Sequence, residues 1–420
     1  MGNVPGLNPI SPSFWVRGEE DIDRDLAALR AQPLQFFESS VPSHLDLPRG
    51  NGIWAVVDYE SILAMSKDTN TFSSARGITA FDAPEIFNEF FGSMIAMDDP
   101  RHGHLRKLVA RGFTPRRLAA LEATVTDQAN LIIDDIADRG EVDFVVDVAA
   151  RLPLAIVCDL MGVPHSELNF VFDQTNIILG SSDPEYVPDA KDIGTALLLA
   201  GGELSEVMKS VAESKRGKDS DDLTTILVNA EVDGQRLTTS DIASFFILLV
   251  VAGNETTRNA ISWGLHYLTK NPEQRAIWQG DPDGVTGTAV EEIVRLASPV
   301  TYMRRTATCD TELDGTNISA GDKLAMFYIA ANRDEQIFPD PLRFDVRRTP
   351  NRHIGYGGPG PHYCLGAHLA RREIGVMFRR LFERLPDIEA TSEPDVLQSS
   401  FIHGVKHLRA SFTPGGSTRP

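Results

Sequence analysis

Cysteine is scarce in this sequence, which contains three such residues among 420. Cys158, Cys309 and Cys364 are unevenly spaced, and this excludes the disulfide framework that supports many small secreted domains. We therefore expect a reducing, cytoplasmic environment. Of the three, Cys364 is distinguished by its position among glycines and prolines.

Positive charge is also in deficit, because 59 acidic residues outnumber 40 Lys and Arg and leave a net charge of -19. Such a surface repels phosphates, which argues against a nucleic-acid partner. The longest apolar run, residues 243–253, is too short to span a bilayer. The N-terminal residues lack a basic region followed by a hydrophobic stretch, so we expect no signal peptide.

Low-complexity linkers, repeats of fixed period and charge blocks are absent, so one continuous domain over residues 1–420 is expected. Apolar residues recur every three to four positions between about 99 and 270, a period typical of helices. The predicted fold class is mainly α with a minor β portion. Helices are expected at about 99–298 and 365–385. Strands are expected at about 31–75, 300–330 and 398–413, including a hairpin at the Asp314-Gly315 turn.

One long helix is predicted after the caps available at residues 238–240 and before the Asn271-Pro272 pair. It is apolar almost all round, so it should cross the centre of the protein. Glu255 and Thr256 break this pattern, because a buried carboxylate is costly unless it is compensated. The Thr256 hydroxyl can bond the carbonyl of Ala252 and loosen the helix into a bulge, which often marks a functional site.

Residues 355–366, GYGGPGPHYCLG, place Cys364 just ahead of an amphipathic helix. Free amides and the positive end of that helix favour a thiolate. Gly358, Gly360 and Gly366 leave room for a flat group against the backbone. A thiolate on such a loop is typical of proximal haem ligation. A lone cysteine would more often be a buried structural residue.

The loop resembles the haem loop of cytochromes P450, with matches at Tyr356, Gly358, Gly360, His362, Cys364 and Gly366. Tyrosine replaces the usual phenylalanine, and one extra residue separates it from the cysteine, which could alter hydrogen bonding around the sulfur. The resemblance implies the cytochrome P450 fold, a triangular helical prism with a small β-sheet region. It also implies haem b between the long helix and the Cys-loop helix, with Cys364 as the axial thiolate.

The same resemblance implies roles for residues far from this loop. Thr256 and Glu255 would relay protons to dioxygen bound in the groove of the long helix. The expected haem contacts are His102, Arg106, Ala252, Arg305, His362, Gly358 and Gly366. The histidines and arginines among them would bind the haem propionates. Arg304, next to Arg305, is a weaker candidate for that role. Glu292, Arg295 and Arg343 would form a structural triad. Each of these residues alone would more often be a surface residue or an ordinary helix ion pair.

Within the family, the sequence is similar to actinobacterial members that oxidise methyl-branched lipids, and related members attack the terminus of sterol side chains. A terminal hydroxylation of such a lipophilic substrate is therefore expected. The implied pocket residues, each of which could equally be ordinary core, are Phe91, Ile95, Leu248, Val251, Val300 and Phe401. Val251, Ala252, Val300 and Phe401 are expected to form a constriction that admits only a chain end.

Electrons must come from outside, because the chain has no nucleotide-binding glycine motif and no four-cysteine iron–sulfur pattern. We expect a ferredoxin and its reductase as partners, with O2 as co-substrate. A basic docking patch is a candidate, although these residues could equally form a solvated helix face: Arg352, Arg371, Arg372, Arg379 and Arg380.

Two other functions stay open at this stage. One is a peroxide-driven peroxygenase, against which the intact Glu255 and Thr256 argue. The other is a non-catalytic haem or lipid-binding sensor, which has little need of a proton relay. Turnover with a ferredoxin and its reductase separates the sensor from the enzyme.

Overall fold

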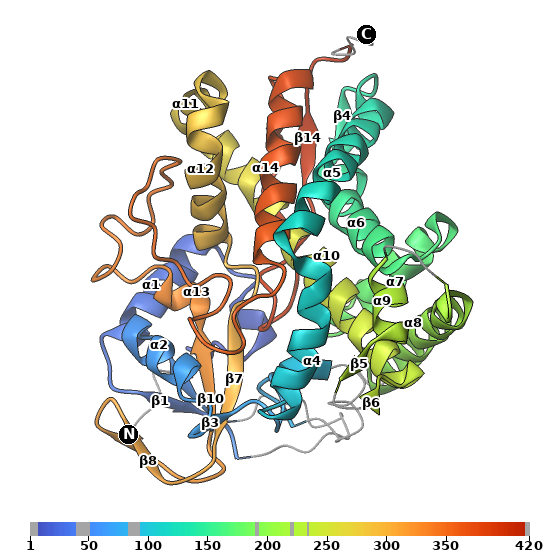
Figure 1. Cartoon of the computed structure of the whole chain (residues 1–420). Helices are drawn as coiled ribbons and strands as arrows, with labels where there is room; N and C mark the ends of the chain where they lie inside the picture. Colours follow the sequence, from blue (N-terminus) through green and yellow to red (C-terminus); the bar gives the residue numbers. More distant parts are fainter. Residues whose placement is uncertain are drawn as a thin grey trace.

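The computed structural model of the chain describes residues 7–38, 51–82, 93–189, 193–218, 222–232 and 235–415. Most of this part is helical (Figure 1). The helices are α1 (Glu19–Arg30), α2 (Tyr59–Lys67), α4 (Arg101–Val109), α5 (Pro115–Ile136), α6 (Arg151–Met161), α7 (Leu168–Leu179), α8 (Ile193–Lys215), α9 (Leu223–Asn229), α10 (Thr239–Lys270), α11 (Pro272–Gly280), α12 (Pro282–Ala297), α13 (Tyr328–Ala331) and α14 (Ala367–Arg384). None of the helices in these ranges combines the length and the hydropathy that crossing a membrane requires.

Helix α10 lies at the centre of the helical part (Figure 1). It begins with a capping box, in which Thr238 and Asp241 each accept a hydrogen bond from the backbone amide of the other. It ends where Pro272 opens α11, because proline cannot continue a helix. Its sides contact α6, α7, α8, α12 and α14. The predicted helix and its central course are confirmed.

The largest sheet lies beside the helices and supplies one wall of the site. Its strand order is β1 (Gln35–Phe37), β2 (Ile53–Val56), β10 (Lys323–Phe327), β7 (Tyr302–Ala307) and β3 (Phe72–Ser73). Only the pair β2–β10 is parallel. Successive side chains of a strand point to opposite faces. Met303 and Arg305 of β7 therefore face the helical part, whereas Arg304 points the other way and pairs with Asp82 at 2.8 Å.

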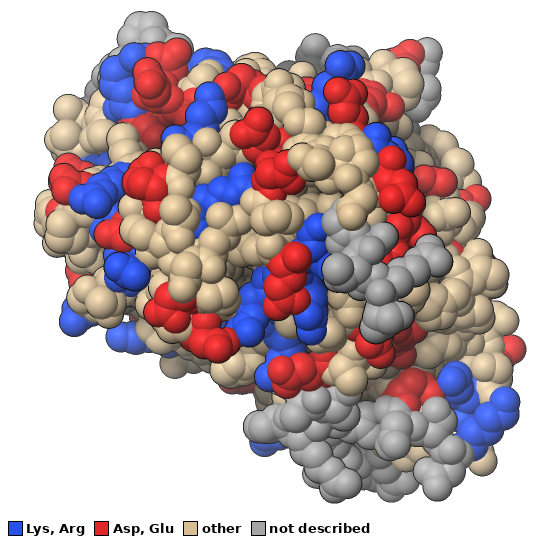
Figure 2. Space-filling view, turned by 90° about the horizontal axis from the view of Figure 1, so that it is seen from above, with Lys and Arg blue, Asp and Glu red and all other residues tan. Residues whose placement is uncertain are grey.

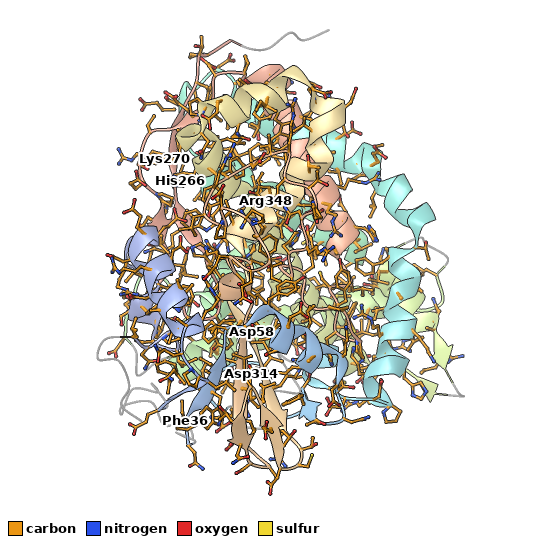
Figure 3. All side chains as sticks on the ribbon, turned by 90° about the vertical axis from the view of Figure 1, so that its left-hand side faces the viewer. Phe36, Asp58, His266, Lys270, Asp314 and Arg348 are labelled. Atoms are coloured by element: carbon orange, nitrogen blue, oxygen red, sulfur yellow. The ribbon has the colours of Figure 1, made fainter. Side chains whose placement is uncertain are left out.

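The predicted hairpin joins β8 (Thr311–Leu313) to β9 (Thr316–Ile318). At its turn, Asp314 has φ 50° and Gly315 has φ 71°, the positive values that a tight hairpin turn requires. The hydroxyl of Ser61 in α2 lies 2.7 Å from a carboxylate oxygen of Asp314 and 2.8 Å from one of Asp58, the cap of α2 (Figure 3). The hairpin is thereby fixed to α2.

The remaining strands form small sheets at the periphery. These are β11 (Glu389–Ala390) with β14 (Arg409–Ser411) and β4 (Glu141–Asp143), β12 (Asp395–Val396) with β13 (Val405–His407), and β5 (Glu231–Val232) with β6 (Gln235–Arg236). The predicted class, mainly helical with a minor β portion, is confirmed. The assignment of residues 1–420 to a single domain stays a prediction.

Candidate active site

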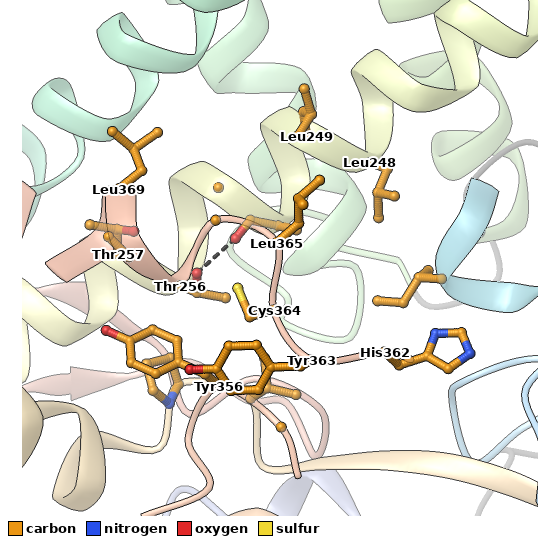
Figure 4. Close-up of a pocket in the computed structure, with 18 of the residues that line it drawn as sticks. Leu248, Leu249, Thr256, Thr257, Tyr356, His362, Tyr363, Cys364, Leu365 and Leu369 are labelled. Carbon is orange, nitrogen blue, oxygen red and sulfur yellow. Dashed lines mark hydrogen bonds between the residues drawn. The ribbon is translucent and has the colours of Figure 1, made fainter. Parts of the chain in front are cut away.

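A cavity of about 230 Å³ lies between α10, the loop before α14 and strand β7. Cys364 lines it on the loop side, and Thr256 lines it on the α10 side (Figure 4). The rest of the wall is mostly apolar, and its members include Met94, Ile95, Phe113, Val157, Leu160, Leu248, Leu249, Ala252 and Val300. A thiol is therefore enclosed together with a hydroxyl in a largely water-excluding space.

The surroundings of Cys364 act on its thiol in opposite directions. Burial raises the pKa of the Cys364 thiol. Hydrogen bonds from the amides of Gly366 and Ala367, together with the charges of Arg106 and Arg371, favour the thiolate and oppose that rise. The amides belong to the start of α14, as the sequence predicted. The sulfur is thus desolvated, yet it has the donors that an anion uses.

The glycines of the loop have two different functions, and this corrects one expectation. Gly366 lines the cavity, and a Cβ there would meet nothing within 4 Å. Gly358 instead lies against α2, where a Cβ would stand 2.5 Å from the hydroxyl of Ser66. A Cβ on Gly360 would collide with the Ser66 carbonyl oxygen. Gly358 and Gly360 therefore permit close packing of the loop on α2 and do not contact the cavity.

Four basic side chains line one end of the cavity: His102 and Arg106 of α4, Arg305 of β7, and His362 of the loop. The rings of His102 and His362 lie with centroids 4.2 Å apart. Burial and the neighbouring positive charges lower the pKa of His362 to about 3. Arg304, on the opposite face of β7, does not line this cavity.

Arg305 is buried with its charge incompletely satisfied. It is 4 % exposed, and its Nε has no hydrogen-bond partner among the described residues. One Nη donates to the Arg304 carbonyl at 3.0 Å. A buried cation left in this state calls for an anion. The basic end of the cavity, with a thiol and glycine-lined backbone nearby, therefore fits a flat group that carries carboxylates, which is the description of haem.

Thr256 behaves locally as predicted, because its hydroxyl donates to the Ala252 carbonyl at 2.7 Å (Figure 4). Helix α10 nevertheless runs unbroken from Thr239 to Lys270, so the expected bulge is absent from it.

Glu255 does not lie where the relay role required. It is 1 % exposed and is not among the residues that line the cavity, so it reaches neither the cavity nor solvent. Its Oε1 accepts hydrogen bonds from Arg258 and, at 3.2 Å, from Asn259. Arg258 in turn donates to the Oδ1 of Asn176 in α7 at 2.8 Å. The second oxygen, Oε2, has no hydrogen-bond partner within the described ranges.

The structural triad contains Arg348 in place of the predicted Arg343. The Arg295 guanidinium donates to both oxygens of Glu292 at 2.7 and 2.8 Å. The Nε of Arg348 lies 3.0 and 3.1 Å from the same oxygens (Figure 3). Arg343 contributes its carbonyl, which accepts from Arg348 at 2.8 Å, while its side chain is exposed. The prediction of Arg343 as third member was wrong because both arginines lie in the one irregular loop between α13 and α14, where no helical or strand period tells which side chain turns inward.

The predicted pocket residues divide into two groups. Ile95, Leu248 and Val300 line the cavity. Val251 and Phe401 do not: Val251 packs into the helical core, and Phe401 packs edge-on against Tyr302 with ring centroids 5.5 Å apart. Phe91 lies outside the described residues. The constriction expected from Val251, Ala252, Val300 and Phe401 is therefore wrong in two of its members.

Sequence reasoning missed Glu373 of α14, which lines the cavity and is 2 % exposed. Burial raises the pKa of this carboxyl to about 8. The signal was present, because Glu373 lies on the apolar face of an amphipathic helix. Tyr363 and Met94, which also line the cavity, carried no comparable signal.

The predicted basic patch is largely neutralised. Arg371 bonds Glu291 at 2.5 and 3.1 Å, and Arg379 bonds Asp283 at 2.7 Å. Arg372 pairs with Glu122, and Arg380 pairs with Glu383. Toward the ends of α11 and α14, Figure 2 shows basic and acidic side chains interspersed. This face is therefore mixed in charge.

Comparison with known proteins agrees with the geometry. The family model "Cytochrome P450" matches residues 187–279 and 284–403. The methyl-branched lipid omega-hydroxylase of Mycobacterium tuberculosis is 46 % identical over 410 residues, which cover 96 % of this chain and 94 % of that protein. The steroid C26-monooxygenase of Mycobacterium bovis is 37 % identical over 414 residues, covering 97 % and 93 %.

Among solved structures, the cytochrome P450 CYP268A2 of Mycobacterium marinum in complex with pseudoionone superimposes with a TM-score of 0.93 at 38 % identity. The match covers 98 % of this chain and 100 % of that one. The predicted cytochrome P450 fold is thereby confirmed. The chain belongs to the cytochrome P450 family.

Proposed function

We propose that this P450 monooxygenase hydroxylates a terminal methyl group of a methyl-branched lipid, an isoprenoid or a sterol side chain. The observation that carries the proposal is the mostly apolar cavity that Leu248, Ala252 and Val300 line together with Thr256, with Cys364 on its opposite side. Relatives named for omega-hydroxylation and C26 oxidation support the same position of attack.

Family membership implies a haem held by a cysteine thiolate, and we propose haem b with Cys364 as its axial ligand. The amides of Gly366 and Ala367 would stabilise the ligand as an anion. The propionates would be bound by His102, Arg106, Arg305 and His362. When bound, the haem supplies the oxidising chemistry that cleaves dioxygen and inserts one oxygen atom into a C–H bond.

The apolar walls would select the position of attack. A primary C–H bond is stronger than the secondary and tertiary bonds beside it, so reactivity alone would not choose it. Selectivity then has to come from positioning, which requires that only the chain end reaches the reacting centre. Ile95, Leu248, Ala252 and Val300 line the cavity and would hold the methyl terminus there while excluding water.

Thr256 and Glu255 would move protons in this site. The Thr256 hydroxyl now donates to the carbonyl of Ala252, and by rotating it would donate into the cavity. Glu255 would supply the next proton after exchanging its contact with Arg258, because its present orientation leads away from the cavity. We therefore propose Thr256 and Glu255 as the proton relay, which requires that Glu255 first leaves Arg258 and turns toward the cavity.

The electrons would come from a ferredoxin and its reductase. Arg371 and Arg379 are each paired with an acidic side chain of this protein. Docking would therefore depend on ferredoxin carboxylates replacing these acidic partners, rather than on attraction to a broad positively charged surface.

Two measurements test the function. The reduced protein with carbon monoxide should show the strongly red-shifted Soret band of haem-thiolate, and Cys364→His should lose that band, whereas Cys309→Ser should keep it.

With a ferredoxin, its reductase and isotopically heavy dioxygen, an iso-branched fatty acid should give an alcohol with one heavy oxygen. Product formed with hydrogen peroxide but not with the ferredoxin system would favour the peroxygenase. A globin-like spectrum would contradict the haem assignment.

A further inference from the structure

A second cavity, also about 230 Å³, lies where α4, α8, α9 and the start of α10 meet. Met94 and Phe245 line both this cavity and the one that contains Cys364. These two side chains are 7 % and 5 % exposed and separate the two spaces. Methionine is unbranched and adaptable, so the Met94 side chain can change its conformation more readily than a branched side chain could.

The second cavity differs from the first in its polar groups. Arg101, at the start of α4, lines it with an exposed side chain that makes no ion pair with any described residue. Lys209 of α8 also lines it and contacts Glu206 at 2.7 Å, but that carboxylate is 73 % exposed. An ion pair open to water is weak, so Lys209 can exchange this partner for a ligand.

A third polar group is buried inside the same cavity. Ser205 of α8 lines it and is 4 % exposed. A hydroxyl beside two cations, all facing one space, is suited to an anion that accepts hydrogen bonds.

One acidic residue, Asp241, also lines the cavity. Its carboxylate accepts from the amide and the hydroxyl of Thr238, at 2.9 and 2.6 Å, and so completes the cap of α10. The other two charged side chains of the wall, Arg101 and Lys209, are basic.

We propose that this second cavity binds the carboxylate head of the substrate. Arg101 and Lys209 would pair with the anion, and Ser205 would donate a hydrogen bond to it. The alkyl chain would then pass between Met94 and Phe245 and end on the α10 side of the active-site cavity, near Thr256. The inference rests on the proposed terminal hydroxylation and specifies the substrate as a fatty acid rather than a neutral lipid.

This arrangement supplies something that the active-site cavity lacks. Apolar walls hold a chain against sideways movement but do not fix how far it enters. A carboxylate held at a fixed distance sets the depth of entry, so one carbon is presented for oxidation. The two cavities would therefore act as a ruler for chain length.

The test compares an iso-branched fatty acid with its methyl ester, which has the same chain and no charge. Dissociation constants are measured with the haem-loaded protein by calorimetry and by the substrate-induced spectral shift. The wild-type protein should bind the acid about tenfold or more tightly than the ester. The double variant Arg101→Gln/Lys209→Gln should bind both equally, with the affinity for the ester unchanged.

Lys107→Gln is the matched control, because it removes one charge from the exposed face of α4 and lines neither cavity. It should keep the preference for the acid. Equal affinity for acid and ester in the wild type, or an equal loss in Lys107→Gln, would overturn the head-group site while leaving terminal hydroxylation in place. If neither compound binds, the proposed function itself fails, and the head-group site fails with it.

Discussion

Arg258 holds the carboxylate of Glu255, one turn earlier on α10, in a buried ion pair that does not line the active-site cavity. Asn176 of α7 holds Arg258 from the other side at 2.8 Å. The acid is thus connected to a neighbouring helix through one arginine. Movement of α7 relative to α10 would change how firmly Glu255 is held.

This pair gives the first prediction. Glu255→Gln should slow turnover by about 10-fold or more, as expected for the loss of a proton-transfer group, with little change in substrate affinity. Turnover and the dissociation constant are measured together. Arg258→Met leaves Glu255 buried without its partner and should lower the free energy of unfolding by about 3–5 kcal/mol. A loss of affinity alone in Glu255→Gln would contradict the relay role.

Thr256 gives the second prediction. Thr256→Ala should bind substrate and accept electrons as before, but it should divert several-fold more of the reducing equivalents to hydrogen peroxide. Without the hydroxyl, the cavity loses the donor that now bonds Ala252. Thr256→Ser keeps a hydroxyl and should restore most of the coupling. Unchanged coupling in Thr256→Ala would mean that the residue is structural.

The third prediction separates Arg348 from Arg343. Arg348→Ala removes a partner of Glu292, which is fully buried, and should cost about 3 kcal/mol or more in the free energy of unfolding. Arg343→Ala trims an exposed side chain and should change stability by about 0.5 kcal/mol or less. Urea unfolding of the two variants side by side measures this difference. Equal losses would restore Arg343 to the triad.

The fourth prediction concerns pH and Glu373. Its pKa in the folded protein is raised to about 8, so the folded state keeps a proton that the unfolded chain releases above its ordinary value of 4.5. Stability from this group is therefore present at low pH and is lost as pH rises from about 4.5 to 8, by an amount on the order of 4 kcal/mol.

Glu373→Gln should remove this part of the pH dependence, as seen by urea unfolding at pH values across that range. Glu383→Gln, an exposed position on the same helix, is the control and should leave the pH profile unchanged. A Glu373→Gln profile identical to that of the wild type would show that the carboxyl is ionised in the folded state.

Local rules explain what the sequence predicted correctly. Thr238 and Pro272 bound α10 because capping and the missing proline amide act within a few residues. Asp314 and Gly315 make the hairpin turn for the same kind of reason. Cys364 was found because its flanking glycines and the helix after it are contiguous in the chain.

The errors arose where the direction of a side chain is set by packing. Val251 and Ala252 are adjacent, but successive residues of a helix point about 100° apart. Ala252 therefore faces the cavity, and Val251 faces the core. Gly358 and Gly360 were assigned to haem because the sequence does not reveal that Ser66 of α2 lies against them. The second cavity was missed because its walls come from two parts of the chain, residues 94–109 and 205–245, that are distant in sequence.

The position of oxidation tests terminal hydroxylation most directly. An iso-branched fatty acid and the straight-chain acid of equal length are incubated together with the enzyme, a ferredoxin and its reductase, and the alcohols are identified by mass spectrometry. We predict a primary alcohol on a methyl of the branch as the main product, with the branched acid consumed faster. Mainly in-chain alcohols, or faster consumption of the straight chain, would contradict presentation of the chain end to the Cys364 site.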